Sequence, residues 1–226
     1  HSCGLQLSDD DRQGVMCVFS GLVWFDIAEE EVIAKKLFDD IRIKNSIAPT
    51  MLYVPGSQRV LFLYPPVTQD NRQDLVFYDL KGEEFKEVAR WDKITQKQMF
   101  SVDKIVKDMA IDASGSKVVL GASHNQFLID VSNPGDIDLT NKSAAILGER
   151  VERLVDASNF PKHEMPKKYY EPVAVAISPS GERFVVAYDK GYTREYLFGD
   201  DGKIVSLGDK PQMNYPVVAI SSVSGT

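Results

Sequence analysis

One strand–turn–strand pattern occurs four times along this chain, and it constrains the fold more than any other feature. Its best-preserved copy lies in residues 172–207, where four short runs of β-branched and aromatic residues are separated by three turns rich in Gly, Asp, Ser and Lys. These turn residues supply a positive or preset φ, and runs of this composition are typical of strands. The stretch therefore predicts a four-stranded antiparallel meander.

The turn between the first two strands of this meander recurs along the chain. It occupies residues 178–181 and is matched by 112–115, by 54–57 and, in a degenerate form, by 8–11. An apolar run precedes each copy and another follows it. Three copies also have a third strand that ends in an aspartate, and these aspartates are about 50 residues apart, a period typical of stacked sheet units. They are Asp26, Asp79 and Asp130.

The strand end Trp24-Phe25-Asp26, placed after a Ser-Pro-Ser-Gly type of hairpin, resembles the WD40-like family of β-propeller repeats. The resemblance covers most of the chain, from about residue 5 to about residue 225. It implies an all-β fold, a β-propeller of four-stranded antiparallel blades with about four blades in this chain and one helical insertion. For the family, protein–protein interaction is the implied role.

The repeats predict one propeller domain over residues 1–226. We expect blades at about 4–40, 48–92, 105–140 and 171–208, the start of a further blade at 215–226, and a helical or loop insertion at 141–170. The final segment either closes a four-blade ring or begins a blade of a larger propeller. We favour the larger propeller, because residues 5–8 already resemble the inner strand of the first blade.

The insertion is the sequence's candidate for partner binding. Its first half places apolar residues three or four apart, which predicts an amphipathic helix, and its second half is loop-like with two prolines. We expect the helix to pack across a blade edge, with partner contact as the alternative. The residues that would make such contact are Ile146, Leu147, Arg150, Val151, Leu154, Phe160, Lys167, Tyr169 and Tyr170.

The repeated aspartates are expected to have a structural role. An aspartate at a strand end can accept hydrogen bonds from the turn that follows and fix the hairpin. Because equivalent positions repeat along the chain, Asp26, Asp79 and Asp130 are predicted to lock turns and not to take part in catalysis.

The chain shows no pattern typical of catalysis, of a metal site or of a cofactor. Its three histidines, at positions 1, 124 and 163, form no ligand motif, and there is no nucleophile elbow or phosphate loop. Carboxylates cluster at 9–11 and 136–138 without the spacing of a Ca²⁺ loop, so we expect solvated turns there. We predict no catalytic, cofactor-binding or metal-binding residues.

Charge and hydropathy exclude other partners. The net charge of -7 does not favour nucleic acid, and no run of about 18 apolar residues is present to insert in a membrane. With only Cys3 and Cys17, disulfides cannot hold the fold, which favours the cytoplasm. The alternative is a periplasmic or extracellular lipoprotein, because residues 1–4 resemble the mature end of one.

These observations predict a non-catalytic WD40-like scaffold or subunit that mediates protein–protein interactions in a multiprotein assembly. The alternative is an extracytoplasmic propeller enzyme or ligand-binding protein that uses its central channel. Channel chemistry needs ionisable residues on the innermost strands, and those strands are mostly apolar here. Loss of a measured turnover on alanine replacement of Lys107, Asp108 and His124 would favour that alternative.

Overall fold

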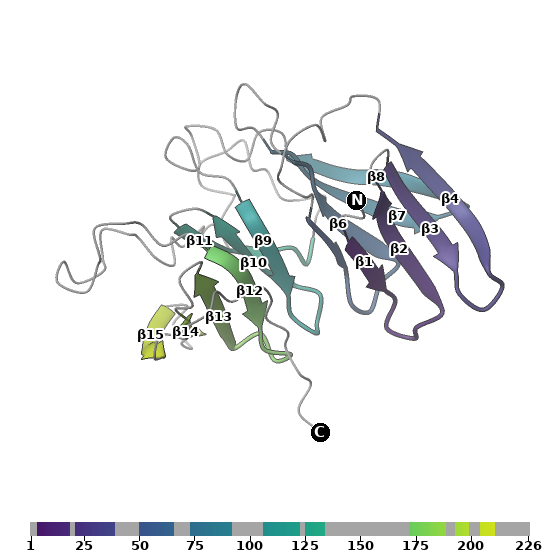
Figure 1. Cartoon of the computed structure of the whole chain (residues 1–226). Coiled ribbons are helices and arrows are strands. Elements are labelled where there is room, and N and C mark those ends of the chain that lie inside the picture. The colour runs from purple at the N-terminus through teal and green to yellow at the C-terminus, as the bar shows by residue number, and fades with distance from the viewer. Residues whose placement is uncertain are drawn as a thin grey trace. The chain divides into compact units, whose positions relative to one another are not determined.

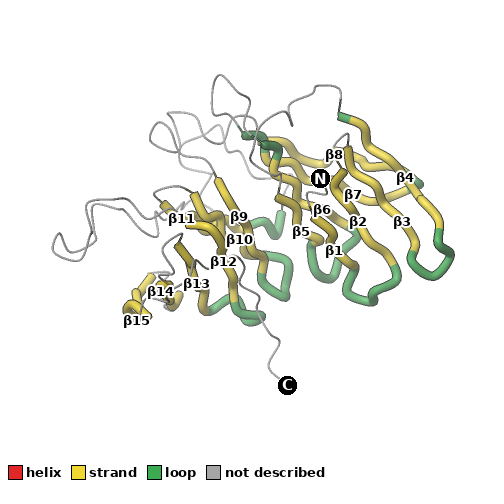
Figure 2. The backbone as a smooth tube through the Cα atoms, viewed as in Figure 1, coloured by secondary structure: helices red, strands yellow, loops and turns green. Residues whose placement is uncertain are grey.

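The computed structural model describes residues 4–18, 21–38, 50–65, 73–91, 106–122, 125–133, 172–188, 193–198 and 204–210. In these ranges the regular structure consists of strands, without a helix (Figure 2). No helix in the described part of the chain is therefore long and apolar enough to cross a membrane. The predicted helical insertion at 141–170 lies outside the described residues.

Fifteen strands of the described ranges form four antiparallel sheets (Figure 1). Sheet 1 contains β1 (Gly4–Leu7), β2 (Gln13–Val18), β3 (Gly21–Asp26) and β4 (Glu31–Leu37). Sheet 2 contains β5 (Thr50–Tyr53), β6 (Arg59–Leu63), β7 (Leu75–Lys81) and β8 (Glu84–Trp91). Sheet 3 contains β9 (Val106–Ile111), β10 (Lys117–Ala122) and β11 (Asn125–Asp130). Sheet 4 contains β12 (Pro172–Ile177), β13 (Arg183–Tyr188), β14 (Thr193–Phe198) and β15 (Ile204–Lys210).

In each sheet the strands follow one another in chain order, so each sheet is a meander. This confirms the predicted all-β class. Sheet 3 has three strands among the described residues, and residues 134–140 of its predicted blade lie outside them.

The four aligned turns form the same hairpin. In sheet 4 the Ser178 N–H donates to the carbonyl of Arg183 at 2.7 Å, and the Gly181 N–H donates back to the Ser178 carbonyl at 2.8 Å. Because both bonds lie within six residues, the local sequence is enough to form the turn. The first of these bonds recurs from Ser8 to Gln13, from Val54 to Arg59 and from Asp112 to Lys117.

The turn in sheet 2 differs in backbone conformation from the others. Gly115 and Gly181 adopt a positive φ at the fourth turn position, and Asp11 does so in sheet 1. In sheet 2 the positive φ moves one residue earlier to Gly56, directly after Pro55. Proline followed by glycine is the sequence of a type II turn, which explains the shift.

In sheets 1, 2 and 3 the third strand is joined to the hairpin by one further backbone bond. The residue after the strand-end aspartate donates its N–H across to the residue before the second strand at 2.7–2.8 Å. The donor and acceptor pairs are Ile27 with Arg12, Leu80 with Gln58 and Val131 with Ser116.

Two of the three aspartates lock the following turn as predicted. Asp26 accepts the N–H groups of Ala28 and Glu29 at 2.9 and 3.0 Å, and Asp130 accepts the N–H and hydroxyl of Ser132. The third, Asp79, instead accepts a hydrogen bond from the guanidinium of Arg59 on the neighbouring strand β6. The Arg59 Nε and the Asp79 Oδ1 are 2.6 Å apart.

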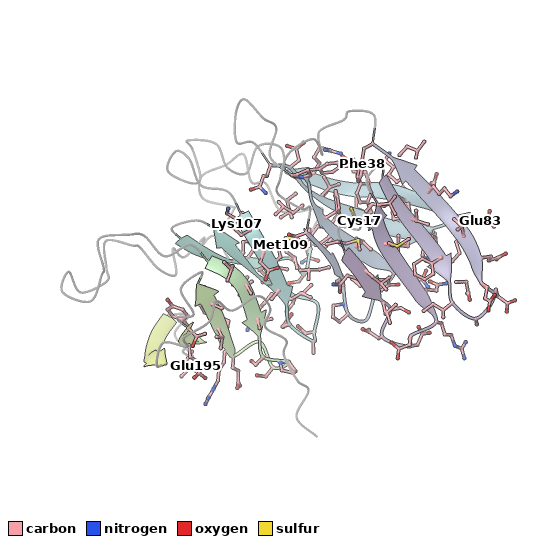
Figure 3. The ribbon with its side chains drawn as sticks, viewed as in Figure 1. Cys17, Phe38, Glu83, Lys107, Met109 and Glu195 are labelled. Carbon is pink, nitrogen blue, oxygen red and sulfur yellow. The ribbon has the colours of Figure 1, made fainter. Side chains whose placement is uncertain are left out.

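The chain divides into two compact units, one with sheets 1 and 2 and one with sheets 3 and 4. In the first unit, one face of sheet 1 and one face of sheet 2 share a buried core (Figure 3, where Cys17 and Phe38 are labelled). The rings of Phe38, Phe62 and Tyr64 gather at one part of it, with centroids 4.7–5.4 Å apart. The Cys17 thiol is fully buried and lies 3.8 Å from the Val18 carbonyl.

Adjacent sheets within each unit are also joined at their first turns. In the first unit the Gly56 N–H donates to a carboxylate oxygen of Asp9 at 2.6 Å. In the second unit the Ala113 N–H donates to the Pro179 carbonyl at 3.1 Å, and the Lys117 ammonium lies 3.4 Å from the Gly181 carbonyl. Turn-to-turn contact is therefore a feature of both units.

Candidate functional site

The partner-contact residues predicted from the sequence, 146–170, lie outside the described residues, as does His124. Their role stays a prediction. The described residues offer four other features that could carry function: a polar hollow, a tyrosine–arginine cluster, a partly buried carboxylate and an exposed apolar sheet face.

The polar hollow lies where the first turns of sheets 1 and 2 meet, and its volume is about 540 Å³. Carboxylate, guanidinium, amide and hydroxyl groups line it together with one tyrosine ring. The lining residues are Ser8, Asp9, Asp10, Arg12, Gln13, Asp26, Tyr53, Gly56, Ser57 and Gln58.

The carboxylates of this hollow hold the turns that form it. Besides Asp9 and Asp26, whose turn bonds are given above, Asp10 accepts the Ser8 hydroxyl at 2.6 Å and the Arg12 N–H at 3.2 Å. The Ser8 bond, helped by the Arg12 N–H, lowers the pKa of Asp10. Burial, with the charges of Asp10 and Asp9, raises the pKa of Tyr53. The hollow therefore has the hydrogen bonding of a structural turn.

Residues 9–11 were predicted to be a solvated turn, and all three are exposed. Within the described ranges, no group of three or more His, Cys, Asp or Glu side chains could hold a metal ion.

A tyrosine–arginine cluster occupies sheet 2. The hydroxyls of Tyr64 and Tyr78 are 2.8 Å apart, and the Arg90 guanidinium lies 5.5 Å from the Tyr64 ring centroid. Arg90 also forms a two-point ion pair with Glu87 at 2.9 and 2.7 Å and contacts Asp74 at 3.3 Å. The Arg90 bonds lower the pKa of Glu87, and burial raises that of Tyr78. Because carboxylates neutralise Arg90, the cluster stabilises the sheet and is a poor anion site.

The partly buried carboxylate belongs to Asp108 on β9, which lies in the sequence between Lys107 and Met109, both labelled in Figure 3. Its Oδ2 accepts the N–H of Val175 on β12 at 2.8 Å, so it joins the innermost strands of sheets 3 and 4. Burial raises its pKa, and the N–H bonds from Val175 and Met109 oppose that rise. The carboxylate thus provides a hydrogen-bond acceptor for one backbone N–H on the edge strand β12.

The exposed apolar surface is the side of sheet 1 that faces away from sheet 2. Residues paired across antiparallel strands project from the same face, and alternate residues along a strand share it. The pairing places the members of one face in register across all four strands. We call this the open face; its residues are Leu5, Leu7, Met16, Val18, Val23, Phe25, Val32, Lys35 and Leu37.

Several of these apolar side chains are strongly exposed. Leu5 is 53% exposed, Val32 51% and Leu37 65%, whereas Val15 and Cys17, which project from the opposite face of the same sheet, are 0% exposed. Contiguous exposed apolar residues on a folded protein mark an interaction surface. The open face is therefore the strongest candidate site among the described residues.

Sequence reasoning did not identify the open face. The signal was present in β2, where Val15 and Cys17 alternate with Met16 and Val18, so that apolar residues lie on both faces of the strand. This alternation shows that both faces are suited to packing, and only the fold shows which of them is covered.

Comparison with known proteins identifies the fold and no close relative. No protein-family model matches the chain, and no curated protein matches it. Among solved structures 1199 chains match, so the fold is too widely shared to identify a function by itself. One is the β-propeller domain of Cps50 (Swd1) from Myceliophteria thermophila, with a TM-score of 0.58 and 10% identity.

That match covers 92% of this chain and 58% of the propeller domain's chain, so the present chain spans little more than half the length of its structural neighbour. The likeness, with the antiparallel sheets, confirms the predicted β-propeller fold.

Proposed function

We propose that this protein is a non-catalytic, WD40-like propeller that binds partner proteins as a scaffold or subunit of a multiprotein assembly. The observation that carries the proposal is the open face of sheet 1, where Leu5, Val32 and Leu37 are more than half exposed. Burial of such side chains in a partner contributes about 25 cal/mol for each Å² of apolar area removed from water. Rigid strands hold them in one plane, which lowers the entropic cost of binding.

Two further features support a binding role. The polar side chains of the hollow and of the Arg90 cluster are occupied by structural hydrogen bonds and ion pairs. The net charge of -7 favours protein partners over nucleic acid.

The proposal places the protein in the cytoplasm, and cell fractionation with an antibody to the native protein tests that placement.

The insertion at 141–170 is a second proposed contact. Its residues Ile146, Leu147, Val151 and Leu154 have the spacing of one apolar helix stripe. If that stripe packs on a blade, only the open face remains to contact partners.

Affinity purification of the full-length protein tests the proposal. Three forms are compared with wild type: a deletion of 141–170, the double variant Leu5→Glu/Leu37→Glu, and the control Ile27→Glu. Ile27 is 40% exposed and lies outside the open face, so the control adds one such charge at another exposed apolar position of the same repeat.

We expect the double variant to lose partners that the control retains. Loss on deletion alone would assign binding to the insertion. A wild-type protein that copurifies with no partner, and remains a monomer with an unoccupied open face, would refute the proposed function.

A further inference from the structure

We propose that the polar hollow at the first turns of sheets 1 and 2 is a binding site for an alkylammonium group, the group that ends a lysine side chain or a free polyamine. The site is independent of the proposed function, because none of the residues that line the hollow belongs to the open face. Three observations carry it: the free oxygens of three aspartates, a buried tyrosine that reaches the hollow, and the arrangement of these acceptors.

Each aspartate of the hollow uses one carboxylate oxygen to hold a turn and keeps the other free. The turn bonds occupy Oδ2 of Asp9, Oδ1 of Asp10 and Oδ1 of Asp26. The second oxygen of each carboxylate accepts no hydrogen bond from the residues that the structure describes. Because the turn bonds already fix these side chains, a ligand that meets the free oxygens does not have to order them.

Tyr53 adds a neutral acceptor to the hollow. It ends β5 and is only 6% exposed, with its ring in the core shared by sheets 1 and 2. Burial and the charges of Asp10 and Asp9 raise the pKa of its hydroxyl, which therefore faces the carboxylates and stays neutral. This hydroxyl forms no hydrogen bond within the described part of the chain. Buried polar groups are generally hydrogen-bonded, so it indicates a ligand that donates.

The charge of the hollow favours a cation. Its lining contains three carboxylates against the single guanidinium of Arg12, which gives a net charge of -2. Arg12 forms no ion pair with any described residue, so its guanidinium does not close off one of the carboxylates. Carboxylates that share a hollow raise the local concentration of cations.

The arrangement of the acceptors selects an ammonium group among cations. A metal ion needs its ligands around one point, and the acidic side chains of the described ranges form no such group. A guanidinium pairs best with both oxygens of one carboxylate, whereas each carboxylate here has only one oxygen free. An ammonium donates three separate bonds from a point charge, which suits single oxygens on different side chains. The volume of about 540 Å³ leaves room for the alkyl chain that carries it.

Titration of the ¹⁵N-labelled full-length protein with n-butylammonium chloride tests the proposal. The ionic strength is held constant, and binding is followed by NMR of the backbone N–H groups. The N–H groups of Gly56 and Arg12 report on the hollow, because Asp9 and Asp10 accept them. We expect both resonances to shift and to reach saturation together.

An internal control and a second cation separate binding from general attraction. The Ser132 N–H is bonded in the same way to Asp130, at a turn of sheet 3 that does not line the hollow, and its resonance should not shift. Tetramethylammonium carries the same charge without an N–H donor, so it should bind roughly fivefold or more weakly than n-butylammonium.

Three variants test the residues. Asp10→Asn keeps an acceptor for the Ser8 hydroxyl and the Arg12 N–H and removes the charge, so it should weaken n-butylammonium binding roughly tenfold. Tyr53→Phe keeps the ring in the core and should weaken binding about fivefold. The matched control Glu84→Gln removes one charge from an exposed position on β8 outside the hollow and should leave the affinity unchanged.

Two larger ligands then assign the source of the ammonium group. Tighter binding of the peptide acetyl-Gly-Lys-Gly-amide than of spermidine assigns the site to a partner's lysine, and the reverse order assigns it to a free polyamine.

Four outcomes would overturn the proposal: no saturable shift at Gly56 and Arg12, an equal shift at Ser132, equal binding of tetramethylammonium, or equal losses in the Asp10→Asn and Glu84→Gln proteins. Full affinity in the Tyr53→Phe protein would remove the tyrosine from the site and overturn it as well. The proposed function would survive each of these results, because it rests on the open face.

Discussion

Replacement of Asp112 tests whether the hairpin common to the four sheets is held by one side chain. Asp112 is 2% exposed, and its Oδ1 accepts the N–H groups of Ser116 and Lys117, both at 2.9 Å. Its Oδ2 accepts the Ser114 hydroxyl at 2.6 Å. Asp112→Ala leaves both backbone N–H groups without this acceptor.

The expected loss follows from those two bonds. A buried donor without an acceptor costs about 1–3 kcal/mol, and water that reaches the exposed tip of the turn lowers that cost. We therefore expect the free energy of unfolding to fall by about 3 kcal/mol in total. For a chain of this size each kcal/mol lowers Tm by about 2–4 °C, so Tm should fall by roughly 6–12 °C.

Asp112→Ser is the matched variant, because the other repeats already use serine at this place. In sheets 1 and 4 the hydroxyls of Ser8 and Ser178 each accept the N–H five residues on, from Gln13 and Arg183, at 3.0 Å. The serine variant should retain that one bond and lose only about 1 kcal/mol. Both variants are measured by thermal and urea unfolding followed by circular dichroism. Equal losses in the two variants would refute this account of the hairpin.

Three further predictions concern single side chains. Gly21→Ala should destabilise the protein by about 3 kcal/mol, because its Cβ would overlap the backbone of β4; a urea midpoint equal to that of wild type would contradict the close approach of the two strands. Tyr64→Phe should cost about 1–2 kcal/mol in the same assay, because the buried hydroxyl of Tyr78 loses its partner, and a neutral result would show that water replaces that bond. Burial raises the folded pKa of Asp108 above its usual 3.8, so its contribution to stability is greatest below that value and is lost as the pH rises through the folded pKa. Asp108→Asn keeps an acceptor for the Val175 N–H and should remove this part of the pH dependence of unfolding; an unchanged profile would show that Asp108 titrates alike in both states.

The strand-end aspartates show where sequence reasoning succeeds and where it stops. Asp26 and Asp130 bind N–H groups two or three residues ahead, so their role can be read from the adjacent sequence. Asp79 occupies the same repeat position and pairs with Arg59, which is 20 residues away in the chain. That pair depends on the strand register, which places Arg59 directly opposite Asp79.

Contacts between sheets lie further beyond the reach of the sequence. The bond from Val175 to Asp108 joins residues 67 positions apart, and no local pattern marks either one. If the central channel carried chemistry, Asp108 would be a candidate catalytic residue. In the structure its carboxylate instead accepts the N–H of Val175 on the edge strand β12.

The sequence by itself determined the hairpins, the meander of each sheet and the all-β class, because turn chemistry and the alternation of apolar residues act over a few neighbouring positions. Only the tertiary structure decided which face of sheet 1 is covered. Val15 and Met16 are neighbours of similar character in one strand, yet one projects into the core shared with sheet 2 and the other onto the open face. Burial depends on what lies opposite a side chain, and that is set by the packing of distant segments.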